Sequence, residues 1–179
     1  LVPQCPDLHV LIVGGELSTD PEPFQAELIQ RAIDLGIRDR ITFTGFRDDT
    51  PELLGLMDIF TLPTYFGEGL PRSILEAMAM GLPIVTTDIR GCREAVVPNH
   101  NGLIVPPRDS DALAQALATL LSDPALRQRF GTASRQRVEA EFDETFVFQR
   151  LVAWYRDLGI TFPETTPATS TPSAVATVL

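Results

Sequence analysis

Two acidic side chains, Glu68 and Glu76, stand eight residues apart in a segment whose residue types suit ligand binding. Gly67 and Gly69 flank the first of them, and because glycine has no Cβ, the backbone there can approach a ligand closely. Pro71 then begins a predicted helix over 71–80, whose free amides and dipole favour an anion. The segment therefore predicts a seat for an anionic ligand.

Glu76 has apolar neighbours on almost every side of this predicted helix, so we expect it to be buried. A buried carboxylate needs partners, and the two hydroxyls of a ribose ring would supply one for each oxygen. The alternative is that Glu76 pairs with Arg72, four residues earlier, on a solvated face, while Glu68 only decorates a turn. The residues alone leave both interpretations open.

Short apolar runs that alternate with helical patterns must position these residues. The strands are expected over 8–13, 41–43, 59–62, 83–86 and 103–105. The helices are expected over 22–35, 52–57, 71–80, 91–97, 109–122, 124–141 and 144–158. This alternation predicts a parallel sheet, in which ligands lie beyond the carboxyl ends of the strands. The loops to inspect therefore follow Val13, Phe43, Leu62, Thr86 and Val105.

The spacing of Glu68 and Glu76 recurs inside an ordered set of motifs. Phe66-Gly-Glu-Gly-Leu-Pro71 and Leu75-Glu-Ala-Met-Ala-Met-Gly-Leu-Pro83 are accompanied by matching stretches over 8–15, 41–47, 58–64, 87–94 and 101–106. The whole set resembles the C-terminal, donor-binding half of GT-B retaining glycosyltransferases of the group 1 or family 4 type. It is similar to bacterial capsule and exopolysaccharide enzymes.

The resemblance implies a role for each matching residue. Glu76 would bind the ribose hydroxyls of a nucleotide sugar, and Glu68, the expected catalytic residue, would orient the transferred sugar. The remaining donor-binding residues would be Phe46 and Arg47 at the base, Thr64 near the phosphates, and Gly67, Gly69 and Leu70 along the sugar and diphosphate. Pro71 replaces a glycine common in the family and removes one backbone donor.

The implied fold class is α/β, a Rossmann-like parallel sheet with flanking helices that lacks its first strand. In the strand order 3-2-1-4-5-6 the first strand is central, so the five predicted strands would be the second to the sixth. The expected domain covers 1–160, and the Thr-, Ser- and Pro-rich stretch 161–179 is expected to be a disordered tail. We expect this chain alone to be inactive and to expose apolar surface.

The implied reaction is retaining transfer of a hexosyl or N-acetylhexosaminyl group from a nucleotide-diphosphate sugar, with UDP expected and GDP the alternative. A glycan or lipid-linked acceptor would bind through an N-terminal domain that this sequence lacks. No cofactor or metal is expected. Two other interpretations stay open, namely a nucleotide-sugar epimerase of the same architecture and a non-catalytic interaction module.

The overall composition narrows the function classes. The net charge of −10 argues against a nucleic-acid surface, and all fourteen basic residues are Arg, which excludes lysine chemistry. Two Cys make no disulfide framework, and no run reaches the length of a membrane span. These features favour a cytoplasmic location, or a peripheral one at the inner face of the membrane.

Weaker candidates lie elsewhere in the chain. Gly14-Gly15-Glu16 is either a structural turn or a loop near phosphate, and Cys92 lacks a nearby His to activate it as a nucleophile. Four arginines over 127–137 are expected on a solvated helix face.

Overall fold

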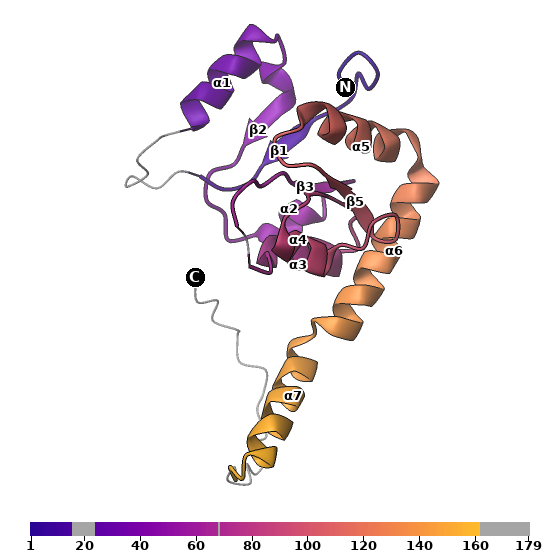
Figure 1. Cartoon of the computed structure of the whole chain (residues 1–179). Helices are drawn as coiled ribbons and strands as arrows, with labels where there is room; N and C mark the ends of the chain where they lie inside the picture. The colour runs from indigo at the N-terminus through magenta and orange to yellow at the C-terminus, as the bar shows by residue number, and fades with distance from the viewer. Residues whose placement is uncertain (16–23, 68, 162–179) are drawn as a thin grey trace. The chain divides into compact units, whose positions relative to one another are not determined.

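The computed structural model describes residues 1–15, 24–67 and 69–161 (Figure 1). Glu16, Glu68 and the predicted tail from 162 onward therefore lie outside the described residues. The chain divides into two compact units, and the second begins at Asp143. The boundary predicted near residue 160 remains a prediction.

The elements follow the predicted alternation of strands and helices. The strands are β1 (Val10–Ile12), β2 (Ile41–Phe43), β3 (Phe60–Leu62), β4 (Ile84–Thr87) and β5 (Gly102–Val105). The helices of the first unit are α1 (Gln25–Asp34), α2 (Thr50–Leu54), α3 (Arg72–Ala79), α4 (Arg90–Ala95), α5 (Ser110–Ser122) and α6 (Pro124–Glu141), with a 3-10 turn at Arg38–Arg40. The second unit contains α7 (Glu144–Asp157).

The strands form two parallel sheets. One sheet pairs β1 with β2, and the other has the order β3-β4-β5. These are the pairs that the order 3-2-1-4-5-6 predicts on each side of its central first strand. The structure thus confirms the α/β fold class, a Rossmann-like arrangement without that strand.

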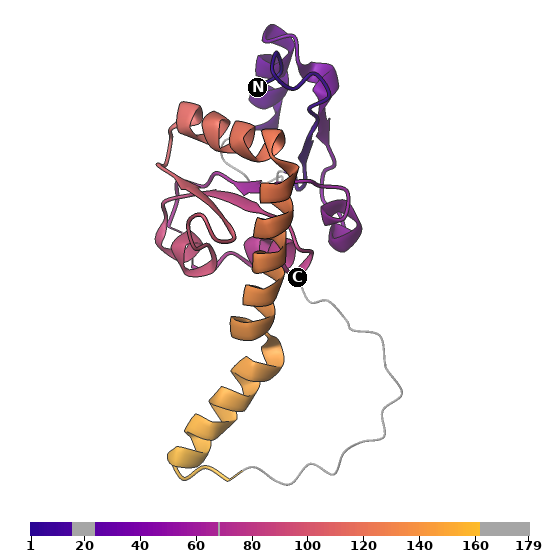
Figure 2. The same cartoon turned by 90° about the vertical axis from the view of Figure 1, so that its right-hand side faces the viewer.

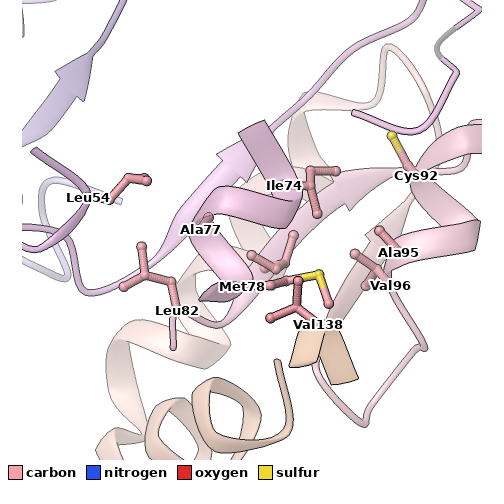
Figure 3. Close-up of a cluster of buried hydrophobic side chains, with 10 residues drawn as sticks. Leu54, Ile74, Ala77, Met78, Leu82, Cys92, Ala95, Val96 and Val138 are labelled. Carbon is pink, nitrogen blue, oxygen red and sulfur yellow. The ribbon is translucent and has the colours of Figure 1, made fainter. Parts of the chain in front are cut away.

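The sheet β3-β4-β5 is covered on both faces because the side chains of β4 alternate. Ile84 points into an apolar cluster with α3 and α4, part of which Figure 3 shows, while Val85 joins a second cluster with α5. Figures 1 and 2 show α5 on one face of this sheet and α3 and α4 on the other. All four residues of β4 are buried, so this strand is the centre of the core.

β1 differs from its expectation. Its apolar run predicts a strand buried on both faces, yet Val10 is exposed and Leu11 and Ile12 are half-buried. The reason is that β1 pairs only with β2, and no residue of these two strands joins either apolar cluster of the described chain. The expected exposure of apolar surface is therefore seen here.

Aspartates cap three of the helices. Asp109 accepts a hydrogen bond from Ala112 N at 2.9 Å, and Asp123 and Asp143 cap α6 and α7 in the same way.

Among the described residues, no helix is long and apolar enough to cross a membrane.

The arginines of α6 make hydrogen bonds that the solvated helix face predicted from the sequence does not include. Three of them donate to carbonyls at the C-terminal ends of other helices, where the dipole favours a cation. These are Arg127 to Leu120 and Leu121, Arg135 to Ala79, and Arg137 to Glu94 and Ala95. The prediction of a solvated face is wrong for Arg127 and Arg137, which are half-buried because α6 packs across the ends of other helices, whereas Arg135 is exposed as predicted.

Candidate functional site

The predicted site residues lie in loops that follow the carboxyl ends of parallel strands. Phe46 and Arg47 follow β2, the segment 64–70 follows β3, and Glu76 lies on the helix after it. Arg47 pairs with Asp49 in its own loop, and Tyr65 packs on Phe66 within the loop after β3. The structure therefore presents two groups of candidate residues.

Two buried hydroxyls of β4 hold the start of the loop after β3. Thr86 Oγ1 donates to the Leu62 carbonyl at 2.9 Å, and Thr87 Oγ1 donates to the Thr64 carbonyl. Both threonines are almost inaccessible to solvent. The loop thus begins from a fixed point at the carboxyl end of the sheet.

Glu76 is exposed, so the expectation that it is buried is wrong. Pro71, Ile74, Ala77 and Met78 form the buried face of α3, and the opposite side of the helix faces outward. Apolar neighbours in the sequence do not bury Glu76, because the helix packs on one side only. Within the described residues, no ion pair joins Glu76 to Arg72, so the alternative pairing is not formed either.

Among the described residues, no hydrogen-bond acceptor meets the first backbone amides of α3. Pro71 occupies the N-cap position with an extended backbone and makes no side-chain cap bond. The first carbonyl-bonded amides are those of Ile74 and Leu75, which donate to the Pro71 carbonyl. The amides of Arg72 and Ser73 are therefore positioned to meet an anion.

Gly67 and Gly69 have no local structural reason to be glycine. Neither has a positive φ, and a Cβ at either position would meet no heavy atom within 4 Å. Backbone strain and packing therefore do not select glycine at these two positions. Close approach of a ligand is the remaining physical reason that the sequence predicts.

The loops after β1 and β2 hold each other. Gly14 N donates to the Gly45 carbonyl at 3.0 Å, and Phe46 lies so close to Gly15 that a Cβ there would sit 3.2 Å from its ring. Gly14 and Gly45 both adopt positive φ. This geometry supports the structural-turn interpretation of the Gly14-Gly15 pair.

Arg47 binds an acidic neighbour through its side chain. Its Nε lies 2.7 Å from Asp49 Oδ1, and the pKa of Asp49 is lowered mainly by this hydrogen bond. The same bond raises the pKa of Arg47. Phe46, the residue before Arg47, is 66% exposed.

One residue pair in the loops was not singled out from the sequence. Arg108, just after β5, has its guanidinium 4.5 Å from the centre of the Tyr65 ring, and Tyr65 packs on Phe66 at 4.3 Å. Arg108 has a φ of 61°, which costs on the order of 1 kcal/mol for a residue with a Cβ. Arg108 lies in the loop after Val105, one of the strand-end loops where a ligand is expected, but no local motif marks this residue.

Comparison with known proteins identifies the family of this chain. Residues 1–137 match the family described as "Glycosyl transferases group 1". The chain belongs to this family. It is 32% identical over 127 residues to alpha-D-kanosaminyltransferase of Streptomyces kanamyceticus, covering 70% of this chain and 33% of that protein.

A second relative is the N,N'-diacetylbacillosaminyl-diphospho-undecaprenol alpha-1,3-N-acetylgalactosaminyltransferase of Campylobacter jejuni. It is 36% identical over 115 residues, which are 64% of this chain and 30% of that protein. The chain thus spans about a third of the length of these two curated relatives.

Solved structures show the same architecture. Anabaena Alr3699/HepE in complex with UDP has a TM-score of 0.80 and 27% identity, over 84% of this chain and 41% of that one. The C-terminal domain of a group 1 glycosyl transferase, LpcC of Francisella tularensis, has a TM-score of 0.73 and 27% identity. It covers 80% of this chain and 74% of that domain structure. The neighbours therefore match the GT-B fold class and its C-terminal half.

Proposed function

We propose that this chain binds the nucleotide-diphosphate sugar of a retaining glycosyltransferase, with UDP as the nucleotide part. The observation that carries the proposal is the loop between β3 and α3. It combines glycines that neither strain nor packing requires with uncapped amides at the start of α3. Such amides suit a diphosphate, and the UDP complex of the Anabaena neighbour supports this ligand class.

Glu76 would bind the ribose hydroxyls in this proposal. Its exposed carboxylate is accessible to a ligand and needs no displacement of a buried partner. Glu68, outside the described residues, would orient the sugar, as the resemblance implies. Thr64 and Leu70 flank this segment on its two sides, with Thr64 held by β4.

The transferred group would be a hexosyl or N-acetylhexosaminyl unit, and the acceptor a glycan or a lipid-linked glycan. The Campylobacter relative, whose name specifies a diphospho-undecaprenol acceptor, supports the lipid-linked class. An acceptor of this kind favours a cytoplasmic protein that works at the inner face of the membrane. The acceptor would bind to a further domain, since the relatives are about three times as long as the matched region.

A titration followed by NMR tests the nucleotide part of the proposal. We expect UDP to bind the full chain with a Kd of ~1 mM or tighter, and GDP to bind more weakly. Glu76→Ala should abolish saturable binding, whereas Glu139→Ala, which removes an exposed glutamate from α6, should leave it unchanged. A folded chain that binds neither nucleotide would contradict donor binding and favour the non-catalytic module.

A further inference from the structure

Arg108 connects two loops that the sequence keeps far apart. It follows β5, and its guanidinium stacks on Tyr65 in the loop after β3, at 4.5 Å from the ring centre. Tyr65 in turn packs on Phe66, which directly precedes Gly67. The stack therefore extends to Phe66, the residue next to the first glycine of the loop.

The same loop is fixed at its other side by β4. Thr87 donates to the carbonyl of Thr64, the residue that precedes Tyr65. With the hydroxyl of β4 on one side and the guanidinium on the other, Tyr65 is held between two strand ends. The two residues that follow Tyr65, Phe66 and Gly67, then start from a position defined by both.

The backbone of Arg108 is an outlier that its contribution to folding does not explain. Its φ of 61° favours glycine, and an arginine persists there only where its side chain gains a compensating contact. The compensating contact is the stack on Tyr65, whose ring is 48% exposed. An exposed stack of this kind is about as favourable as the backbone conformation is unfavourable, so the pair contributes little net stability.

We propose that Arg108 is a positioning residue, which acts through Tyr65 to hold the backbone of Phe66 and Gly67 in the conformation that binds the donor diphosphate. The inference rests on the proposed function for its ligand. It goes beyond that function by assigning loop order to a residue on another strand end.

Four variants of the full chain test the proposal. Arg108→Gly relieves the unfavourable φ and removes the stack, and Arg108→Lys keeps the charge without the planar guanidinium. Tyr65→Leu removes the aromatic ring, and Tyr65→Phe keeps the ring without its hydroxyl. We expect the first three to bind UDP about two- to fivefold more weakly, and Tyr65→Phe to bind within about twofold of the wild type. Arg150→Ala, which removes a similar stack on Trp154 in α7, is the matched control and should bind normally.

Two results would overturn the positioning role. If Arg108→Gly weakens UDP binding and Tyr65→Leu does not, Arg108 contacts the nucleotide directly. If the double variant is weaker than either single variant by the product of their effects, the two residues act independently.

The order of the loop is measured without any ligand. Heteronuclear NOE values of the Phe66 and Gly67 amides should fall in Arg108→Gly and in Tyr65→Leu, while the thermal midpoint stays close to that of the wild type. Unchanged amide dynamics would overturn the inference even if the wild type binds UDP. If the wild type does not bind UDP, but both variants lose loop order, the proposed function is overturned and the positioning role is supported.

Discussion

The Thr87 hydroxyl on β4 donates a hydrogen bond to the Thr64 carbonyl, and so joins the centre of the core to the first residue of the candidate loop. Thr87 is 3% exposed, and its neighbour Thr86 makes the equivalent bond to Leu62. A buried strand residue thus sets the position of the start of an exposed loop.

Replacing Thr87 with valine should destabilise the fold, because the Thr64 carbonyl loses its donor without a change in side-chain size. We expect a decrease of about 1 kcal/mol in the free energy of unfolding, measured by urea denaturation. Thr119→Val is the control, since that exposed hydroxyl only donates to Gln115 within its own helix. Equal effects of the two substitutions would contradict a special role for the bond to Thr64.

The two kinds of glycine in this chain should respond differently to alanine. A Cβ on Gly131 of α6 would collide with the Gly81 carbonyl, so Gly131→Ala should destabilise the chain by about 1–3 kcal/mol. Gly69→Ala meets open space and should leave the thermal midpoint nearly unchanged, yet weaken UDP binding. Normal UDP binding by Gly69→Ala would remove the argument that a ligand approaches this backbone closely.

The pair Arg47–Asp49 predicts a pH dependence with a definite sign. The pKa of Asp49 lies below its ordinary value near 3.8, chiefly because Arg47 donates to its carboxylate. The stabilisation is therefore fully present above pH 3.8 and is lost as the pH falls through the lowered pKa.

Carboxyl chemical shifts followed by NMR check this prediction. Arg47→Ala should raise the pKa of Asp49 toward its ordinary value, and leave unchanged that of Asp143, which is lowered by Thr145 instead. An Asp49 pKa that does not respond to the substitution would show that the hydrogen bond to Arg47 is not formed in solution.

Arg137 should stabilise the first unit more than its charge suggests. Its side chain is 19% exposed and donates to the carbonyls of Glu94 and Ala95 at the end of α4. Arg137→Ala should cost about 1–3 kcal/mol in chemical denaturation, and Arg137→Lys should recover only part of this because lysine lacks the planar set of donors. Gln136→Ala, an exposed neighbour on α6, should be nearly neutral.

Much of the fold could be predicted from local patterns. The strand at Ile41–Phe43 has the predicted bounds, and Gly36 and Gly81, which follow α1 and α3, both adopt the positive φ expected of helix-ending glycines. Asp109 and Asp123, a residue type that favours the N-cap position, cap α5 and α6. These signals act within one turn of backbone, so the sequence contains all that determines them.

The candidate site could be predicted in part. Periodicity places Glu76 on the predicted helix, but it does not tell which side of that helix the sheet covers, and the expected burial was wrong. The ordered motifs identify the family correctly, because the family match covers residues 1–137. The roles of Phe46, Thr64 and Glu76 toward a ligand remain predictions.

The amino-acid sequence by itself determined the order of the elements and the family, since each depends on neighbouring residues or on an ordered set of motifs. Only the tertiary structure decided that Glu76 is exposed, that Arg137 reaches the end of α4, and that Arg108 stacks on Tyr65. The last two contacts join residues more than forty positions apart in the chain. They form because parallel strands bring their carboxyl ends to one edge and because α6 packs across other helices, and no local pattern encodes either event.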